Sequence, residues 1–408
     1  MNGMNGMNMT KALSGIRIAR ISTVPFFVVA QLKQQIAVMG MQGARVTVVA
    51  SDEPEMALLE GIEGVCCVRI DIPRSIAPWR DFHALINLYR LFRSERIQVA
   101  HSTTPKAGLL TALAAFVARV PVRLHTFTGQ PWVTMHGLKR WLARASDKLI
   151  GTLSTRCYTD SASQREYLIS QGIVKKSQLF VIGAGSLAGV NTQRFDRQRF
   201  GEAQCATLRQ SLGISMEAPV LLFIGRITVD KGVRELRQAY LEIKAMGSTA
   251  HLVFVGRFDA ESGVSGEILP IELKQLPDTH IVGYTECPEK YLAIADILCL
   301  PSYREGFGTV VIEAAAMGVP TVGTDIYGLS DAVLDGETGL LVPPRNAEML
   351  TTALMTLICD LPLRQAMGAR AQIRARTLFN ADVVNQALVA EYIHLLRSKH
   401  LIAVGLDA

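Results

Sequence analysis

Two glutamates bracket a glycine-containing segment in the C-terminal half of the chain. Glu305 precedes Gly306 and Gly308, and Glu313 follows on a predicted helix. Carboxylates accept paired hydrogen bonds from the vicinal hydroxyls of a sugar. Because a helix rises about 1.5 Å per residue, the two carboxylates lie roughly 8–12 Å apart, too far to act on one atom. That span suits the two ends of a sugar nucleotide, with Glu313 at the ribose and Glu305 at the sugar, although two solvated glutamates would also fit the pattern.

The turn between these glutamates has the features of a phosphate site. A buried strand is predicted over 295–300 and a helix over 309–317. Gly306 and Gly308 allow a ligand to approach the backbone closely. The N–H groups and the partial positive charge at the helix start, Thr309, favour an anion.

Two cations follow another predicted strand, over 219–225. Arg226 comes directly after Gly225, and Lys231 precedes a predicted helix that begins at Val233. A departing nucleoside diphosphate gains negative charge as its bond to the sugar breaks, and cations can neutralise that charge. A divalent metal held by an Asp-x-Asp motif is the other common solution, but the sequence contains no such motif. Arg226, Lys231 and the start of the 309–317 helix could supply such a positive charge, although surface charges at a helix start are the simpler alternative.

Together the two groups resemble the donor-site motifs of the family-four retaining glycosyltransferases, which have the GT-B fold. The matching residues are Pro301-Ser302-x-x-Glu305-Gly306-Phe307-Gly308 with Glu313, and Gly225-Arg226 with Lys231-Gly232. The resemblance implies an α/β protein of two Rossmann-like domains that face each other across a cleft. The implied catalytic residues are Glu305, Arg226 and Lys231, and the implied donor-binding residues are Gly225, Val282, Tyr284, Gly306, Phe307, Gly308, Thr309 and Glu313, with Val282 and Tyr284 at a uracil base.

The N-terminal half alternates predicted strands and helices. Strands are predicted over 16–23, 44–50, 65–70, 97–101 and 122–127, with helices over 79–93 and 105–118 among them. Such alternation indicates a parallel sheet that is covered on both faces. Ligands bind beyond the carboxyl ends of the strands in such sheets. The residues at these ends that are predicted to bind the acceptor are Thr23, Pro25, His101, Thr103, Lys106, His125 and Thr128.

Some of these acceptor residues have structural alternatives. Thr103 can cap the following helix while His101 has a structural role. Many relatives have a histidine directly before the residue that corresponds to Gly129, but this sequence has Thr128 there, with His125 three residues earlier. Because successive strand residues face opposite ways, His125 and Thr128 point in different directions. The resemblance therefore leaves open whether any histidine is catalytic.

The length of the chain, 408 residues, indicates two domains. We expect residues 1–10 to be disordered, residues 11–190 to bind the acceptor, residues 191–380 to bind the nucleotide sugar, and residues 381–408 to form a helix that crosses back. No apolar run is long enough for a spanning helix, and no signal peptide is expected. The seven scattered cysteines include no Cys-x-x-Cys pair, which favours reduced thiols in the cytosol over disulfides or zinc.

Charge is unevenly distributed along the chain. Residues 1–190 hold 22 Lys and Arg against 11 Asp and Glu, whereas residues 191–408 have a net charge of −5. Within the basic half, residues 131–150 combine tryptophans and leucines with four cations, a composition typical of a helix at a membrane surface. The segment resembles the membrane-facing helix of GT-B enzymes that use polyprenyl-linked acceptors. An amphipathic helix that packs on the sheet, with its basic ends reaching solvent, is the alternative.

The resemblance therefore implies a retaining glycosyltransferase of surface polysaccharide or glycan biosynthesis. We expect transfer of an N-acetylhexosamine from a UDP-sugar to a saccharide linked to polyprenyl (undecaprenyl) diphosphate, as in O-antigen or capsule assembly, without a metal or another cofactor. The enzyme would be cytoplasmic, in peripheral contact with the anionic inner face of the cell membrane. Nucleic acid is not an expected partner, because few aromatic side chains lie among the basic residues. A GDP-sugar donor, a soluble acceptor, a GT-B-fold epimerase and a non-catalytic binding protein remain alternatives.

Overall fold

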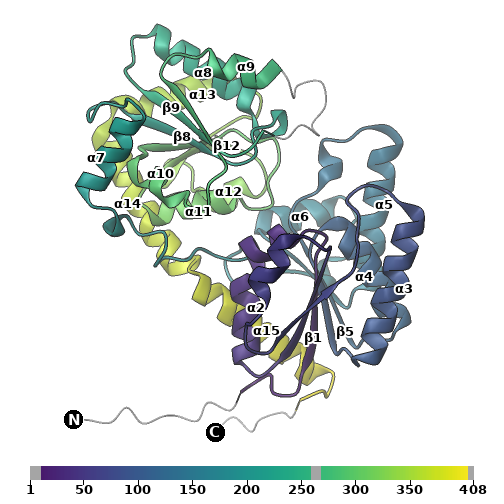
Figure 1. Cartoon of the computed structure of the whole chain (residues 1–408). Helices are drawn as coiled ribbons and strands as arrows, with labels where there is room; N and C mark the ends of the chain where they lie inside the picture. Colours follow the sequence, from purple (N-terminus) through teal and green to yellow (C-terminus); the bar gives the residue numbers. More distant parts are fainter. Residues whose placement is uncertain (1–10, 259–267, 403–408) are drawn as a thin grey trace, which may run out of the picture. The chain divides into compact units, whose positions relative to one another are not determined.

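The chain folds into two α/β units, each built on one parallel sheet (Figure 1). The computed structural model describes residues 11–258 and 268–402. Of the described residues, unit 1 comprises 11–160, 165–182 and 384–402, and unit 2 comprises 161–164, 183–258 and 268–383. The predicted α/β class with two Rossmann-like domains is confirmed. The segment predicted to be disordered, 1–10, lies outside the described residues.

Unit 1 contains a seven-stranded sheet whose neighbouring strands are parallel. Its strands are β1 (Arg17–Ile21), β2 (Arg45–Ala50), β3 (Val65–Arg69), β4 (Val99–Ser102), β5 (Val122–Phe127), β6 (Arg156–Thr159) and β7 (Leu179–Val181), in the spatial order β3-β2-β1-β4-β5-β6-β7. Its helices include α1 (Pro25–Phe27), which continues through a π-helical turn (Val28–Leu32) into α2 (Lys33–Met41), then α3 (Pro78–Ser94), α4 (Pro105–Val117), α5 (Gly137–Leu153), α6 (Ala162–Ser170) and, for most of its length, α15 (Ala381–Ser398). Val46, Val48 and Val49 are fully buried because helices cover both faces of the sheet.

The order of the strands decides which helices cover which face. From β1 the chain steps outward to β2 and β3, then returns to β4 and steps the other way through β5 to β7. Crossovers between parallel strands are right-handed. Consequently α2 lies on one face, and α3, α4 and α5 form a layer on the other (Figure 1). Within that layer α4 packs against both α3 and α5.

A buried polar network joins α15 to the sheet of unit 1. The Arg20 guanidinium donates to the hydroxyl of Tyr392 on α15 (2.9 Å) and to Gln35 Oε1 on α2 (3.2 Å), and it also contacts His101 Nδ1. His101 Nε2 lies 2.8 Å from Thr126 Oγ1. Burial, together with the charge of Arg20, holds the pKa of His101 well below its usual value, so the ring is neutral. The C-terminal helix is thus anchored to unit 1 by groups from β1, β4 and β5.

Unit 2 contains a six-stranded parallel sheet. Its strands are β8 (Val220–Ile224), β9 (His251–Val255), β10 (Thr279–Gly283), β11 (Ile297–Leu300), β12 (Thr321–Thr324) and β13 (Gly339–Val342), in the order β10-β9-β8-β11-β12-β13. Its helices include α7 (Glu202–Ser211), α8 (Val233–Ala245), α9 (Ile268–Lys274), α10 (Glu289–Ile294), α11 (Thr309–Ala316), α12 (Leu329–Ala332), α13 (Ala347–Cys359) and α14 (Leu361–Leu378). Alternate residues of β8 supply two cores: Leu221 and Phe223 pack with α8 and α13, and Leu222 packs with α11 and α14.

Candidate functional site

Two loops of unit 2 meet where the adjacent strands β8 and β11 end. Gly232 has a left-handed backbone (φ 69°), and a Cβ at this position would lie 1.9 Å from the carbonyl oxygen of Pro301. Only glycine permits this approach. The backbone N–H of Tyr303 also donates to the carbonyl of Asp230 (2.9 Å). The loop after β8 and the loop after β11 therefore form one continuous surface.

This contact between loops brings Lys231 and Glu305 together. Lys231 Nζ lies 2.5 Å from Glu305 Oε1, and Ser302 Oγ donates to the same oxygen (2.9 Å). The Lys231 and Glu305 side chains are only 17% and 15% exposed, and Ser302 is fully buried. The ammonium group is thus held in one position at the carboxyl edge of the sheet.

Further cations surround this pair. Arg304 forms an ion pair with Asp230 (3.2 Å), and Thr228 donates to Asp230 (2.5 Å). Burial alone would raise the pKa of Asp230, but the hydrogen bond from Thr228 lowers it. The charges of Arg304, Lys231 and Arg226 lower this pKa further. The structure therefore brings the predicted cations Arg226 and Lys231 together and adds Arg304, for which the sequence analysis assigned no role.

The glycine-containing turn leads directly into α11. Gly308 is left-handed (φ 84°) and precedes Thr309, the first residue of α11. A Cβ on Gly328 would lie 2.7 Å from the Gly306 carbonyl oxygen and 2.8 Å from that of Glu305. The turn therefore packs backbone against backbone on the residue that precedes α12. The N-terminal end of α11 and the ammonium–carboxylate pair belong to one surface that attracts anions.

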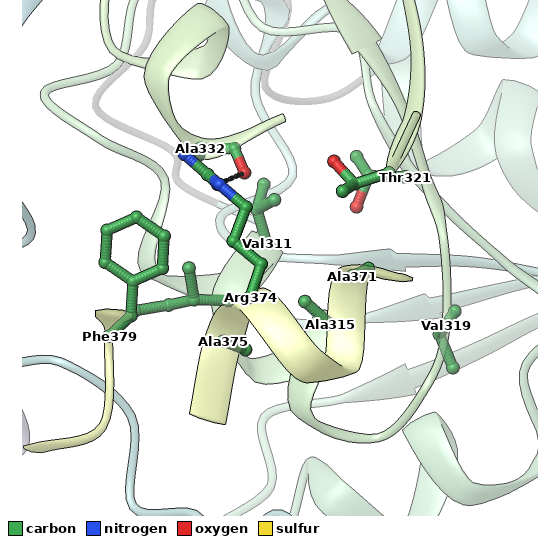
Figure 2. A pocket seen from close by; sticks show the side chains of 11 residues that line it. Val311, Ala315, Val319, Thr321, Ala332, Ala371, Arg374, Ala375 and Phe379 are labelled. Carbon is green, nitrogen blue, oxygen red and sulfur yellow. Dashed lines mark hydrogen bonds between the residues drawn. The ribbon is translucent and has the colours of Figure 1, made fainter. Parts of the chain in front are cut away.

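Helix α14 holds α12 in place through Arg374 (Figure 2). The Arg374 guanidinium donates to the carbonyl oxygen of Ala332 (2.7 Å). It also donates to the carbonyl oxygen of Asp331 (2.6 Å), and these two residues are the last of α12. Its side chain borders a small pocket that is also lined by Val311 of α11 and by Phe379. Because α12 follows the loop that supports the glycine turn, Arg374 helps to fix the shape of that turn.

Phe307 is a core residue. Its ring is buried and packs edge-to-face on Phe379, with the ring centroids 5.0 Å apart. The ring anchors the turn to the core, so the predicted donor contact of Phe307 would be made by its backbone. The Val282 side chain likewise packs against the core of unit 2, so its predicted base contact also depends on the backbone.

Glu313 lies in the second turn of α11, close to another ion pair. Arg194 donates to Glu289 (2.8 Å), and the charges of both residues act on Glu313. Removal from water raises the pKa of Glu313 to about 7, because Arg194 opposes this effect only in part and the Glu289 carboxylate adds to it. The charge of Glu313 therefore changes near neutral pH.

The strands β8, β9 and β10 end in closely packed glycines. The Gly256 N–H donates to the Gly283 carbonyl (2.8 Å), and a Cβ on Gly256 would lie 1.8 Å from the Gly225 carbonyl oxygen. Tyr284 follows Gly283 and is partly exposed, and the guanidinium of Arg257 lies 4.5 Å from the centre of its ring. The sequence analysis missed Arg257, although its Gly-Arg pair directly after a strand repeats the pair that ends β8.

Three predicted acceptor residues lie in the interior of unit 1. His125 Nδ1 lies 2.9 Å from Ser102 Oγ, and a Cβ on Gly108 of α4 would meet the His125 ring. Burial lowers the pKa of His125 to about 3. His101 and Thr103 are also buried. The side chains of His101, Thr103 and His125 are therefore not exposed in this structure, and their acceptor contacts stay predictions.

The other predicted acceptor residues lie nearer the surface at the carboxyl edge of the sheet. Lys106 forms an ion pair with Asp81 (2.6 Å) and donates to the Ser75 carbonyl, so its ammonium group is already bound. Thr128 is partly exposed at the end of β5.

Thr23 and Pro25 are buried beside this edge. The hydroxyls of Thr23 and Thr104 lie 3.0 Å apart, and Thr104 has an unusual positive φ of 67°. Their position at the strand end agrees with the prediction, but their burial leaves Thr128 as the more accessible hydroxyl.

Comparison with known proteins covers both units. Residues 205–374 match the family described as Glycosyl transferases group 1, and residues 28–185 match the Glycosyl transferase 4-like domain. The chain is 28% identical over 368 residues to the capsular polysaccharide biosynthesis glycosyltransferase CapM of Staphylococcus aureus, covering 90% of this chain and 94% of CapM.

Two solved structures share the fold. The sucrose-phosphate synthase of Thermosynechococcus elongatus has a TM-score of 0.77 and 21% identity, covering 94% of this chain and 100% of that chain. HepE of Anabaena, in complex with UDP and glucose, has a TM-score of 0.77 and 18% identity, covering 93% of this chain and 99% of that chain. Unit 2 thus contains a region that matches the group 1 glycosyltransferases, and unit 1 contains a region that matches the glycosyltransferase 4-like domain. The two parallel sheets match the GT-B fold of the solved glycosyltransferase structures.

Proposed function

We propose that the chain transfers an N-acetylhexosamine from a UDP-sugar to a polyprenyl-diphosphate-linked saccharide, with retention at the anomeric carbon and without a metal ion. The observation that carries the proposal is the Lys231 ammonium, held by Glu305 beside the N-terminal end of α11. An ammonium group and a helix start in one place suit a diphosphate. The substrate classes are supported by two similar proteins: the HepE structure contains UDP and glucose, and CapM is named for capsular polysaccharide biosynthesis.

In the proposed reaction the diphosphate leaves and the acceptor hydroxyl enters on the same face of the sugar. The bond between the anomeric carbon and the diphosphate oxygen breaks, and its electron pair stays with the diphosphate. The acceptor oxygen forms the new bond to that carbon, and its proton passes to the departing diphosphate. Lys231 and Arg226 stabilise the negative charge that develops. No protein base is needed, which agrees with the buried position of His125.

Glu305 has two roles in this proposal. Lys231 and Ser302 both bond to Oε1, which leaves Oε2 to accept a hydrogen bond from a sugar hydroxyl. One carboxylate would then fix the position of the sugar relative to the cation that receives its leaving group.

Lys231→Ala is expected to lower the transfer rate by roughly 10²–10³-fold, the loss typical of removing one preorganised group that stabilises developing charge. Glu305→Ala should cause a similar loss, because the ammonium loses the carboxylate that orients it. The measurement is turnover at saturating UDP-sugar and polyprenyl-diphosphate-linked acceptor, with the melting temperature checked for each variant.

Lys244→Ala is the matched control for this experiment. Lys244 Nζ lies 2.7 Å from Asp278, and its side chain is 16% exposed, so each variant removes a lysine that is largely buried and paired with a carboxylate. Lys244 lies at the end of α8, and Asp278 directly precedes β10, at the opposite edge of the sheet. Wild-type turnover in Lys231→Ala, or an equal loss in Lys244→Ala, would contradict the diphosphate role of Lys231.

Binding of UDP is expected to weaken as the pH falls through 7, because the ionised Glu313 is the better acceptor for ribose hydroxyls. With its pKa at about 7, the ionised fraction of Glu313 falls about tenfold between pH 8 and pH 6. Calorimetric titration with UDP at these two pH values measures the change. The UDP affinity of Glu313→Gln should change about tenfold less between these pH values than that of the wild type. Protonation of the UDP phosphate affects the wild type and the variant equally, so the difference between them reports Glu313. The role fails if the two proteins depend on pH equally.

We also propose that α5 makes peripheral contact with an anionic membrane. Leu138, Trp141, Leu142 and Leu149 form one stripe at spacings of three, four and seven residues, and all four side chains are exposed. No helix among the described residues could cross a bilayer, so a contact by this stripe would lie in the membrane interface.

The opposite face of α5 attaches the helix to unit 1. Asp147 Oδ2 accepts a hydrogen bond from Trp132 Nε1 (2.7 Å), and Ile150 and Gly151 are buried on the same face. The helix therefore packs on the sheet through a face that includes a carboxylate, and it presents its leucines and Trp141 to solvent. Lys139 and Lys148 are exposed on this helix as well, which suits anionic headgroups.

Replacing Leu138 and Leu142 together by serine should lower binding to vesicles that contain phosphatidylglycerol by about tenfold or more, since two apolar side chains are lost from the interface. Flotation of the full chain at low salt measures this. The control is Met216→Ser with Ile373→Ser, which removes two exposed apolar side chains from unit 2. Absence of wild-type binding at low salt contradicts the membrane contact.

A further inference from the structure

A second group of exposed apolar side chains lies outside α5. Ile76, Trp79 and Phe82 are 80%, 80% and 54% exposed, in the segment that leads from β3 into α3. Large aromatic side chains are rarely so exposed in groups unless they contact another molecule.

Hydrogen bonds hold this segment in a defined conformation. Lys106 of α4 pairs with Asp81 (2.6 Å) and donates to the Ser75 carbonyl. Asp81 also accepts from the Ala77 N–H (3.1 Å), which closes the first turn of α3. Arg80 makes two hydrogen bonds to Asp71 (2.7 and 2.8 Å). The apolar side chains are therefore presented from a fixed backbone.

Trp79 and Phe82 point away from the sheet. Ala84, Leu88 and Phe92 form the buried face of α3. At 3.6 residues per turn, Trp79 and Phe82 lie on the face opposite to that one. The exposed stripe of α5 is likewise opposite to its buried face.

The two exposed groups lie on one side of unit 1. Helices α3, α4 and α5 form a single layer on the sheet, with α4 between the other two (Figure 1). Trp79 is the second residue of α3, and Leu138 is the second residue of α5. Both helices start at the carboxyl edge of the sheet, and helices in one layer pack about 8–10 Å apart. One flat partner can therefore contact both groups.

We propose that Ile76, Trp79 and Phe82 form a second anchor in the same anionic bilayer that α5 contacts; this inference rests on the proposed function. The charges favour a bilayer as the partner: Arg90 and Arg93 are exposed on the outward face of α3, and residues 1–190 carry a net charge of +11. Tryptophan beside arginine is typical of the membrane interface. The two anchors hold the carboxyl edge of the sheet, where Thr128 lies, at the level of the headgroups, where the diphosphate of a lipid-linked acceptor is found.

The tryptophans of the chain allow the two anchors to be tested separately. Trp132, the third tryptophan, is fully buried, so Trp141→Phe leaves Trp79 as the exposed reporter and Trp79→Phe leaves Trp141. The full chain is mixed with vesicles of phosphatidylcholine and phosphatidylglycerol, with and without brominated acyl chains. Both variants are expected to shift their emission to the blue on binding and to be quenched by the brominated lipid.

Quenching of Trp141 without quenching of Trp79 would overturn the second anchor and leave the α5 contact standing. Binding of neither variant would refute the membrane contact itself. A blue shift of Trp79 that depends on protein concentration and needs no vesicles would identify a second copy of the chain as the partner, and would also overturn the proposal.

A binding measurement completes the test. Trp79→Ser with Phe82→Ser should lower the vesicle partition coefficient by about tenfold. The control, Met41→Ser with Leu58→Ser, removes two side chains of unit 1 that are each 55% exposed but lie outside the α3–α5 layer. UDP affinity should be unchanged in both double variants, which shows that unit 2 remains folded. Equal partitioning of the two double variants contradicts the anchor.

Discussion

The ion pair between Lys231 and Glu305 is the contact on which the site of unit 2 depends. It forms because Gly232 lets the loop after β8 approach the Pro301 carbonyl. A partly buried ion pair adds little net stability, since both charges lose water. Its main effect is to fix the position of a cation beside the start of α11. The glycine turn, α12 and Arg374 of α14 hold that helix start in the same place.

Much of the fold follows from the sequence, because buried parallel strands are short apolar runs between turns. The predicted bounds of β2 and β5 differ from the observed ones by one residue or none. No prediction was made for β6, which has four residues, or for α14. Helix α14 packs through Gly368, Ala371 and Ala375, and small residues give no strong apolar period. The direction of α15 depends on the buried pairing of Arg20 with Tyr392, whose partners are distant in sequence.

The site was predictable where spacing alone decides, and not where burial decides. Strand–loop–helix spacing was enough to place Lys231 near Glu305. The spacing did not show that His101 and His125 are buried. Helices cover both faces of a parallel sheet, so the alternation of side chains along a strand does not indicate an exposed face. Nor did the spacing show that the Phe307 ring packs inward on Phe379, because an aromatic residue in a loop can face either solvent or the core. In α5, Asp147 rather than a leucine lies on the buried face because Trp132 supplies its hydrogen bond.

The most direct test of the central claim is the transfer rate with and without a divalent cation. If Lys231, Arg226 and the start of α11 neutralise the departing diphosphate, turnover should be the same in excess EDTA as in millimolar Mg²⁺. Turnover that disappears on chelation and returns with Mg²⁺ would show instead that a metal ion carries out the role assigned to these cations.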